Sequence, residues 1–367
     1  MSTSAQKSLL PFSQLKLGIL AFFTPALAMA QDVPADLLDL SIEELFQASI
    51  RDELGNDSSQ SSAQSNRWRF SWRYQHSDFD GYKDGSRNLS LDEVMFQPGL
   101  EPRTEKNFPV VPSFIDQDVH ALGIGYVHNE SLSFQAVVPY ITQSTDHFSV
   151  VPGYARFIIE SEGIGDVALL GTYRFRETAN AGWLLGFGLS LPTGSIDEVG
   201  DTPRAPGDQQ LPYSMQVGSG TFDIPLSVAY SRIAGQFSWG GEISGRLRLG
   251  ENDRNYRLGN RFTFSSWLQL NTIDWIRPSL EFSYEYSDKI SGIDREITVP
   301  MAFQFPAPVT NPTMYGGRQA NLVFGLAVPL GSGRQIDLDF GKPIYQSLNG
   351  PQVSEDYRLA VSLNLDL

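Results

Sequence analysis

Twelve segments of the chain carry an apolar residue at every second position. In the first, Arg67–Tyr74, aromatic side chains alternate with arginine or serine. A period of two is that of a β-strand with two unlike faces. The apolar faces of the other eleven segments run from Leu122 to Tyr126, Leu132 to Tyr140, Val167 to Phe175, Trp183 to Leu191, Phe222 to Tyr230, Phe237 to Leu249, Phe262 to Leu270, Ile276 to Tyr286, Ala320 to Val328, Ile336 to Phe340 and Tyr357 to Leu367. The pattern predicts an all-β fold of about twelve strands.

The opposite faces of these segments are polar and include several charged side chains. Five of them come from two segments with one other segment between them, namely Arg246, Arg248, Arg277, Glu281 and Glu285. In a soluble β-sandwich the apolar faces would point into a core. In a membrane β-barrel they would face lipid, and the polar faces would line the lumen. Alternation alone leaves both architectures open.

The lengths of the connections between segments distinguish the membrane barrel from the soluble sandwich. Short turns are expected around residues 129–130, 177–181, 232–235, 271–274 and 330–333, and the links between them are longer, at 77–118, 142–163, 192–220, 251–260, 287–317 and 344–355. Outer-membrane barrels have short periplasmic turns and long external loops. Several aromatic residues also lie near the short turns, as in an interfacial girdle. Residues 67–367 are therefore predicted to form a transmembrane antiparallel up-and-down β-barrel, with both termini in the periplasm.

The first thirty residues have the pattern of a signal peptide. Lys7 and Lys16 precede an apolar stretch, Leu17 to Leu27, and Ala28-Met29-Ala30 fits a cleavage site. A membrane anchor is the alternative, but it needs about 20 apolar residues. We expect cleavage after Ala30 and export to the Gram-negative outer membrane. Cleavage would change the net charge from −15 to −17.

Residues 31–66 form a separate element between the signal peptide and the first strand. Ser41 and Glu44 make a capping box, and apolar residues recur at helical spacing, which predicts a short amphipathic periplasmic helix over 37–49. Residues 55–66 are rich in Ser, Gln and Asn and resemble a flexible linker. The stretch from Asp36 to Leu45 resembles the segment that follows the signal peptide of TonB-dependent receptors. The helix is expected to dock on a periplasmic partner or enter the lumen, with a loosely attached tail as the alternative.

Composition narrows the function classes. The chain has 42 acidic and 27 basic residues among 367, which disfavours binding of nucleic-acid phosphates. It contains no cysteine, so disulfides are excluded. The partners expected are outer-membrane lipid, a small-molecule solute and the assembly machinery, which reads an alternating carboxy-terminal strand such as the one that ends at Leu367.

Three glycine-rich motifs stand at predicted strand ends. Gly163-Ile-Gly-Asp166 precedes a strand, Leu191-Pro-Thr-Gly194 ends one, and Gly218-Ser-Gly-Thr-Phe-Asp223 opens the next. Their order and spacing resemble the outer-membrane barrel family associated with meta-pathway phenol degradation. The resemblance implies uptake of small solutes, aromatic or hydrophobic ones among them.

Three functions remain for such a barrel. A passive channel would use the five charged residues given above as a lumen-lining constriction, whereas in a closed structural or ligand-tethering barrel the same residues would form a bracing salt-bridge lattice. An outer-membrane enzyme would need a histidine beside a nucleophile. We expect no catalytic residues, no cofactor and no metal site, because His120 with Asp116 and Asp118 fits a solvated acidic loop better than a ligand set.

Asp166 and Asp223 each begin a strand directly after a glycine motif, with lumen-facing parity. Strands lie about 4.8 Å apart, so two carboxylates separated by one strand should lie about 10 Å apart. We expect them to form an acidic entry ring that favours cations, covered by loop 192–220. The alternative is that each binds backbone amides and organises the loop.

Overall fold

The structure is a computed structural model that describes residues 68–273 and 275–367. The predicted signal peptide and the predicted helix over 37–49 lie outside the described residues. Within those residues, no helix has the length and hydropathy needed to cross a membrane.

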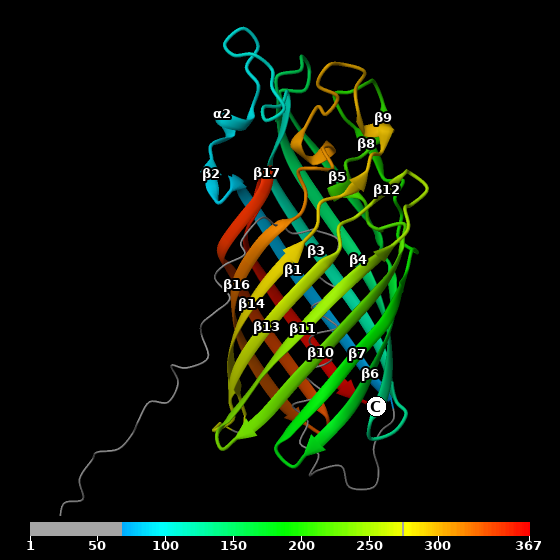
Figure 1. The fold of residues 1–367 in the computed structure, drawn as a ribbon, viewed down its shortest axis with the longest axis vertical. Coiled ribbons are helices and arrows are strands. Elements are labelled where there is room, and N and C mark those ends of the chain that lie inside the picture. Colours follow the sequence, from blue (N-terminus) through cyan, green and yellow to red (C-terminus); the bar gives the residue numbers. More distant parts are fainter. Residues whose placement is uncertain (1–67, 274) are drawn as a thin grey trace, which may run out of the picture. The chain divides into compact units, whose positions relative to one another are not determined.

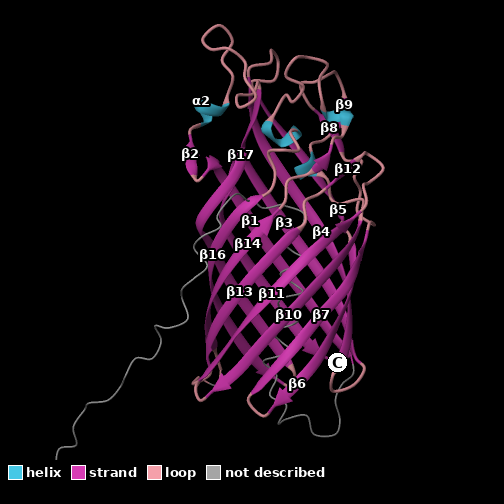
Figure 2. Ribbon diagram, viewed as in Figure 1, coloured by secondary structure: helices cyan, strands magenta, loops and turns pink. Residues whose placement is uncertain are grey.

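Eleven labelled strands of the described chain close into one antiparallel ring (Figures 1 and 2). In spatial order they are β1 (Trp68–Gly85), β3 (Val110–Val127), β4 (Leu132–Ser149), β6 (Val167–Thr178), β7 (Ala181–Leu191), β10 (Phe222–Ala234), β11 (Phe237–Leu249), β13 (Arg261–Leu270), β14 (Arg277–Ser287), β16 (Gly317–Gly331) and β17 (Arg334–Asp366). The ring closes between β17 and β1, where Arg69 is paired with Asp366.

The long element β17 has two antiparallel arms. Residues 334–348 pair with β16, and residues 348–366 pair with β1. The chain reverses at Gly350, whose φ of 76° suits glycine. Lys342 of the first arm bonds Asp356 of the second at 3.0 Å. The two arms correspond to the last two predicted segments, so each of the twelve predicted segments lies in the ring.

The faces of the strands are arranged as in a membrane barrel. The predicted apolar faces are exposed on the exterior, as shown by Ile124, Phe134, Ile243 and Phe324. Polar residues at the alternate positions are buried inside the ring. This is the inverse of a soluble barrel, because a soluble protein buries its apolar face. The chain is an outer-membrane β-barrel, and the predicted fold class is confirmed.

Turns and loops gather at opposite ends of the ring. The connections at one end, such as 128–131, 179–180, 235–236 and 332–333, contain two to four residues. At the other end lie long loops with short elements: β2 (Arg87–Leu89), α2 (Leu91–Val94), β5 (Arg156–Ile164), β8 (Val199–Asp201), β9 (Asp208–Gln210), η2 (Tyr213–Met215), β12 (Tyr256–Arg257), β15 (Ser291–Gly292), η3 (Arg295–Ile297) and η4 (Pro308–Thr310). These ends are called the short-turn end and the long-loop end below.

Three predicted long loops are partly strand, which corrects their boundaries. Of the predicted loop 77–118, residues 86–109 connect β1 and β3, and the rest belongs to these two strands. The predicted loop 142–163 is mostly the β4–β5 hairpin, and the predicted loop 344–355 contains the turn of β17. In the outer half of β4, Thr145 faces inward and Ser144 faces outward, and both are polar. The alternation of hydrophobic and polar residues therefore ends where the strand still continues.

Candidate functional site

The three glycine motifs meet at one junction on the long-loop rim. The Asp166 carboxylate accepts hydrogen bonds from Gly194 N at 2.9 Å and from Ser219 N and Oγ at 2.9 and 2.5 Å. Thr193 Oγ1 accepts from Val167 N at 2.9 Å and donates to Gly165 O at 3.0 Å. Asp166 thus ties together the two ends of loop 192–220.

Two glycines make this junction possible. A Cβ on Gly194 would lie 2.6 Å from Gly218 Cα, and a Cβ on Gly218 would lie 2.2 Å from Gly194 O. Contacts that short are not tolerated, so any side chain would force the two backbones apart. The motifs noted in the sequence therefore mark a close backbone approach.

Asp223 belongs to the same rim but has a different partner. It is fully buried, and its carboxylate accepts from Thr221 Oγ1 at 2.8 Å and forms an ion pair with Arg248, its register partner on β11. Arg248 also receives backbone support, because its N–H donates to Asn260 Oδ1 at 2.9 Å.

The geometry at the rim differs from the expected acidic entry ring. Asp166 is occupied by backbone and hydroxyl donors, and Asp223 is neutralised by Arg248. Neither carboxylate has an exposed face of any size, since both are at most 7% exposed. The rim thus has the loop-organising arrangement that the sequence left as the alternative.

An apolar cluster from three loops lies inside the long-loop end. Tyr213 and Val217 of loop 192–221, Tyr256 and Leu258 of loop 250–260, and Ile290, Ile297 and Tyr315 of loop 288–316 pack on Val119 and Ile141 of the wall. The ring of Tyr213 lies 4.7 Å from that of Tyr256 and 5.7 Å from that of Tyr315. We call this set the loop cluster.

The centre of the loop cluster is Tyr213. Its hydroxyl accepts a hydrogen bond from Asp294 N at 2.9 Å, and burial raises the pKa of Tyr213. Sequence reasoning missed this cluster. A signal was present, because Leu211, Tyr213, Met215 and Val217 alternate within a segment assigned to a loop.

A buried network of charges crosses the lumen below the loops. Glu285 of β14 accepts from Arg261 of β13 at 2.5 Å and lies 3.7 Å from Arg358 of β17. Arg358 makes a second, two-pronged ion pair with Glu355, at 2.6 and 2.8 Å. Two further strands stand between β14 and the second arm of β17 in the ring. The Glu285–Arg358 contact therefore crosses the interior.

The five predicted lumen residues lie at different heights along the barrel, and Glu281 is midway between Arg277 and Glu285 on β14. Arg246, Arg248, Glu281 and Glu285 are buried in the wall. Arg277 lies at the short-turn end, eight residues before Glu285 on the same strand, which is about 26 Å of extended chain. The five do not form one constriction.

Several members of the charge network were absent from the predicted site. Arg261, Glu355 and Arg358 make its main contacts, and Arg73 of β1 reaches Asp339 of β17 at 3.3 Å. Arg358 and Asp339 each lie on the polar face of an alternating segment. Their pairing was not predictable, because it depends on which strands meet across the lumen.

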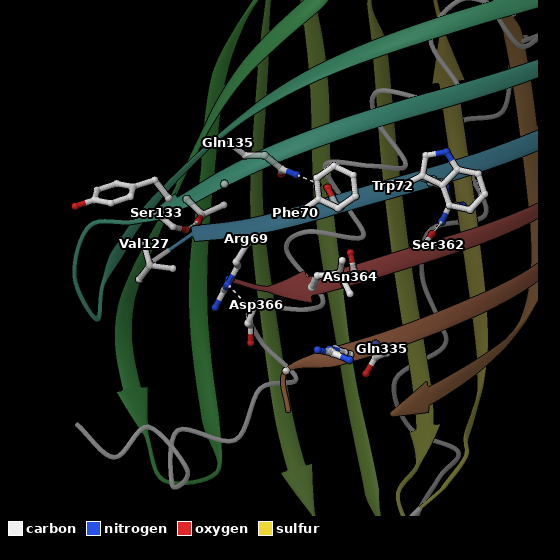
Figure 3. A pocket seen from close by; sticks show the side chains of 18 of the residues that line it. Arg69, Phe70, Trp72, Val127, Ser133, Gln135, Gln335, Ser362, Asn364 and Asp366 are labelled. Carbon is white, nitrogen blue, oxygen red and sulfur yellow. Dashed lines mark hydrogen bonds and ion pairs between the residues drawn. The ribbon is translucent and has the colours of Figure 1, made fainter. Parts of the chain in front are cut away.

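A cavity of about 310 Å³ lies in the lumen at the short-turn end (Figure 3). Its wall includes Arg69, Arg73, Leu170, Arg277, Arg334 and Asp366. Arg69 pairs with Asp366 at 3.3 Å, and Arg73 donates to Ser362 Oγ at 2.9 Å. The side chain of Arg277 forms no hydrogen bond or ion pair with any other described residue. We call this space the inner chamber.

The histidine and aspartate group noted in the sequence lies on the exterior faces of β1 and β3. His76 Nδ1 lies 3.0 Å from Asp118 Oδ1 and 3.7 Å from Asp116 Oδ2, while His120 stacks on Trp72. Within residues 68–273 and 275–367, no group of three or more His, Cys, Asp or Glu side chains could hold a metal ion.

The fold was compared with known proteins. No protein-family model and no curated protein matches the chain. An outer membrane channel from Pseudomonas putida is similar in structure, with 12% identity, a TM-score of 0.53, and coverage of 84% of this chain and 98% of that chain. The toluene transporter TodX of the same species has 12% identity, a TM-score of 0.45, and coverage of 86% and 93%. The first likeness shows that this chain has the fold of an outer-membrane channel.

Proposed function

We propose that the protein is an outer-membrane channel for passive uptake of small solutes, including aromatic and hydrophobic ones. The observation that carries the proposal is the inner chamber, a cavity of about 310 Å³ within the lumen. In many small barrels of about eight strands, by contrast, side chains fill the interior. The resemblance of the three rim motifs supports the same class of solute.

A closed structural barrel is the second candidate. The charge network and the loop cluster favour it, because both fill the lumen above the inner chamber. An enzymatic role has less support. Among the described residues no histidine forms a hydrogen bond with a serine, as a hydrolase of the serine type would require.

Planar-bilayer recording of the purified full chain decides between channel and closed barrel. A channel passes stepwise current in KCl. Ser279→Trp should lower that current, because Ser279 has the inward parity of Arg277 on β14. The matched control is Leu280→Trp, since Leu280 is 42% exposed on the exterior of the same strand. Wild-type protein without any conductance would assign the barrel to the structural class.

A further inference from the structure

The lumen wall has two unlike halves. On β3, β4, β6, β7 and β10, inward residues form a continuous apolar patch consisting of Ala121, Val137, Ala168, Leu170, Leu184 and Ala229. Each of them is at most 4% exposed. Hydroxyls, amides and glycines occupy most other inward positions of these strands. Among the buried residues of these five strands, Asp223 at the long-loop rim is the only Asp, Glu, Lys or Arg.

The other half is charged. The inward faces of β11, β13, β14, β17 and β1 carry Glu242, Arg246, Arg261, Glu281, Glu285, Glu355, Arg358 and Arg73 among their buried residues. Most of the charges in this half face one another, as the Glu285–Arg261 and Arg358–Glu355 pairs show. A solute in the lumen therefore has an apolar wall on one side and a polar wall on the other.

The inner chamber is the place where the two halves border one cavity. Leu170 of the apolar patch and Arg277 lie on β6 and β14, which are five places apart in the ring and thus nearly opposite. Arg334 at the start of β17 also borders the cavity, but it is exposed and shares the outward parity of Ile336. The Arg277 side chain has no partner among the described residues, unlike those of Arg69 and Arg73.

The chemistry of this arrangement selects a class of solute. A guanidinium binds a carboxylate through two parallel hydrogen bonds, and an apolar wall favours a hydrocarbon surface. An apolar cavity of about 150 Å³ holds a benzene ring, so the inner chamber has room for a ring that bears a carboxylate. A neutral aromatic molecule would leave the Arg277 guanidinium without a partner, and a small inorganic anion would leave the apolar wall without a contact.

We propose that the inner chamber binds monocarboxylates with an aromatic or short aliphatic body. The carboxylate lies against Arg277, and the body lies toward Leu170. This inference rests on the proposed channel function for its biological meaning, but binding itself does not require conduction.

Titration calorimetry on the full chain in detergent tests the proposal, with benzoate, acetate and benzyl alcohol as probes. Benzoate should bind more tightly than acetate, which lacks the ring, and more tightly than benzyl alcohol, which lacks the charge. Arg277→Gln should weaken benzoate binding by about tenfold or more. Leu170→Ser should weaken benzoate binding and leave acetate binding unchanged.

The control variant is Arg156→Gln, because Arg156 is an exposed arginine on β5 at the long-loop end. Each variant must keep its heat-modifiable migration on a gel, which reports a folded barrel. Unchanged benzoate affinity in Arg277→Gln would overturn the proposal, as would benzyl alcohol binding as tightly as benzoate. A barrel that binds benzoate but shows no conductance would overturn the channel function alone.

Discussion

At the scale of single residues, an aspartate beside a glycine at the rim can either present its charge to solutes or bind the loop backbone. Asp166 could have presented its charge to solutes, yet its oxygens accept three hydrogen bonds from two loop segments. An ionised carboxylate can accept about four hydrogen bonds. Its charge therefore contributes to holding the loop ends together.

Gly218→Ala tests this junction. The new methyl group would meet Gly194 O at 2.2 Å, and a backbone cannot rotate away as a side chain can. We expect destabilisation of about 1–3 kcal/mol, seen as a lower temperature for the loss of heat-modifiable migration. Gly163→Ala is the matched control in the neighbouring motif, because its methyl group would meet only Val217 Cγ2 at 3.4 Å. Equal effects of the two substitutions would contradict a role for the Gly194–Gly218 contact.

At the scale of elements, each strand consists of a lipid-facing part and a part beyond the lipid. The exterior of β11 is apolar at Ile243, whereas β4 carries Ser144 and Asp146 on its outer exterior. An apolar exterior is needed only where the strand meets hydrocarbon. The β4–β5 hairpin therefore extends beyond the hydrocarbon region of the membrane. Most residues on both of its faces are polar.

Substitution of exterior residues by arginine locates the boundary between the lipid-facing part of a strand and the part beyond the lipid. Ile243→Arg should cost about 2–4 kcal/mol, because Ile243 lies in the middle of β11 and is 66% exposed. Ile158→Arg on β5 should cost about 0–1 kcal/mol, although Ile158 is also exposed, at 60%. The two variants are compared by the fraction of folded protein in isolated outer membranes, which is measured from heat-modifiable migration on a gel. A similar loss for both variants would place β5 within the lipid.

The edge of the lipid-facing region also explains how much of each strand could be predicted from the sequence. All twelve crossing segments were found, because lipid on one side imposes a strict period of two. The outer halves of β1, β3 and β4 were assigned to loops, because their polar residues carry no such period. The charge network around Glu285 and Arg358 was beyond prediction, since it depends on the closure of the ring and on side chains from strands far apart in sequence.

At the scale of the whole molecule, the two ends of the barrel differ in what they contain. The long-loop end holds the loop cluster around Tyr213, and the short-turn end holds the inner chamber. If the protein is the channel proposed above and its short turns face the periplasm, as they do in other outer-membrane barrels, solutes meet the loop cluster first. The loop cluster is then the first barrier to entry, and the inner chamber follows it.

Tyr213→Ala should raise the single-channel conductance in KCl. The substitution removes the ring that contacts Tyr256 and Tyr315 and the hydroxyl that accepts from Asp294 N, so loops 192–221, 250–260 and 288–316 lose a shared contact. Tyr154→Ala is the control, because Tyr154 bonds Asp201 on the exposed side of the loops. An unchanged conductance in Tyr213→Ala, together with an intact barrel, would place the barrier in the charge network instead.

The seam between the first and last strands has a consequence for folding kinetics. Arg69 pairs with Asp366 across 297 positions of sequence, whereas neighbouring strands elsewhere in the ring are joined by local hairpins or by loops of at most a few tens of residues. Loop-closure entropy grows with the number of residues enclosed, and contacts of high sequence separation form late. The meander can therefore assemble hairpin by hairpin as an open, curved sheet, and the seam is expected to join last. Until then two unpaired strand edges are exposed, so this final pairing is the step at which an incomplete barrel is most prone to aggregate.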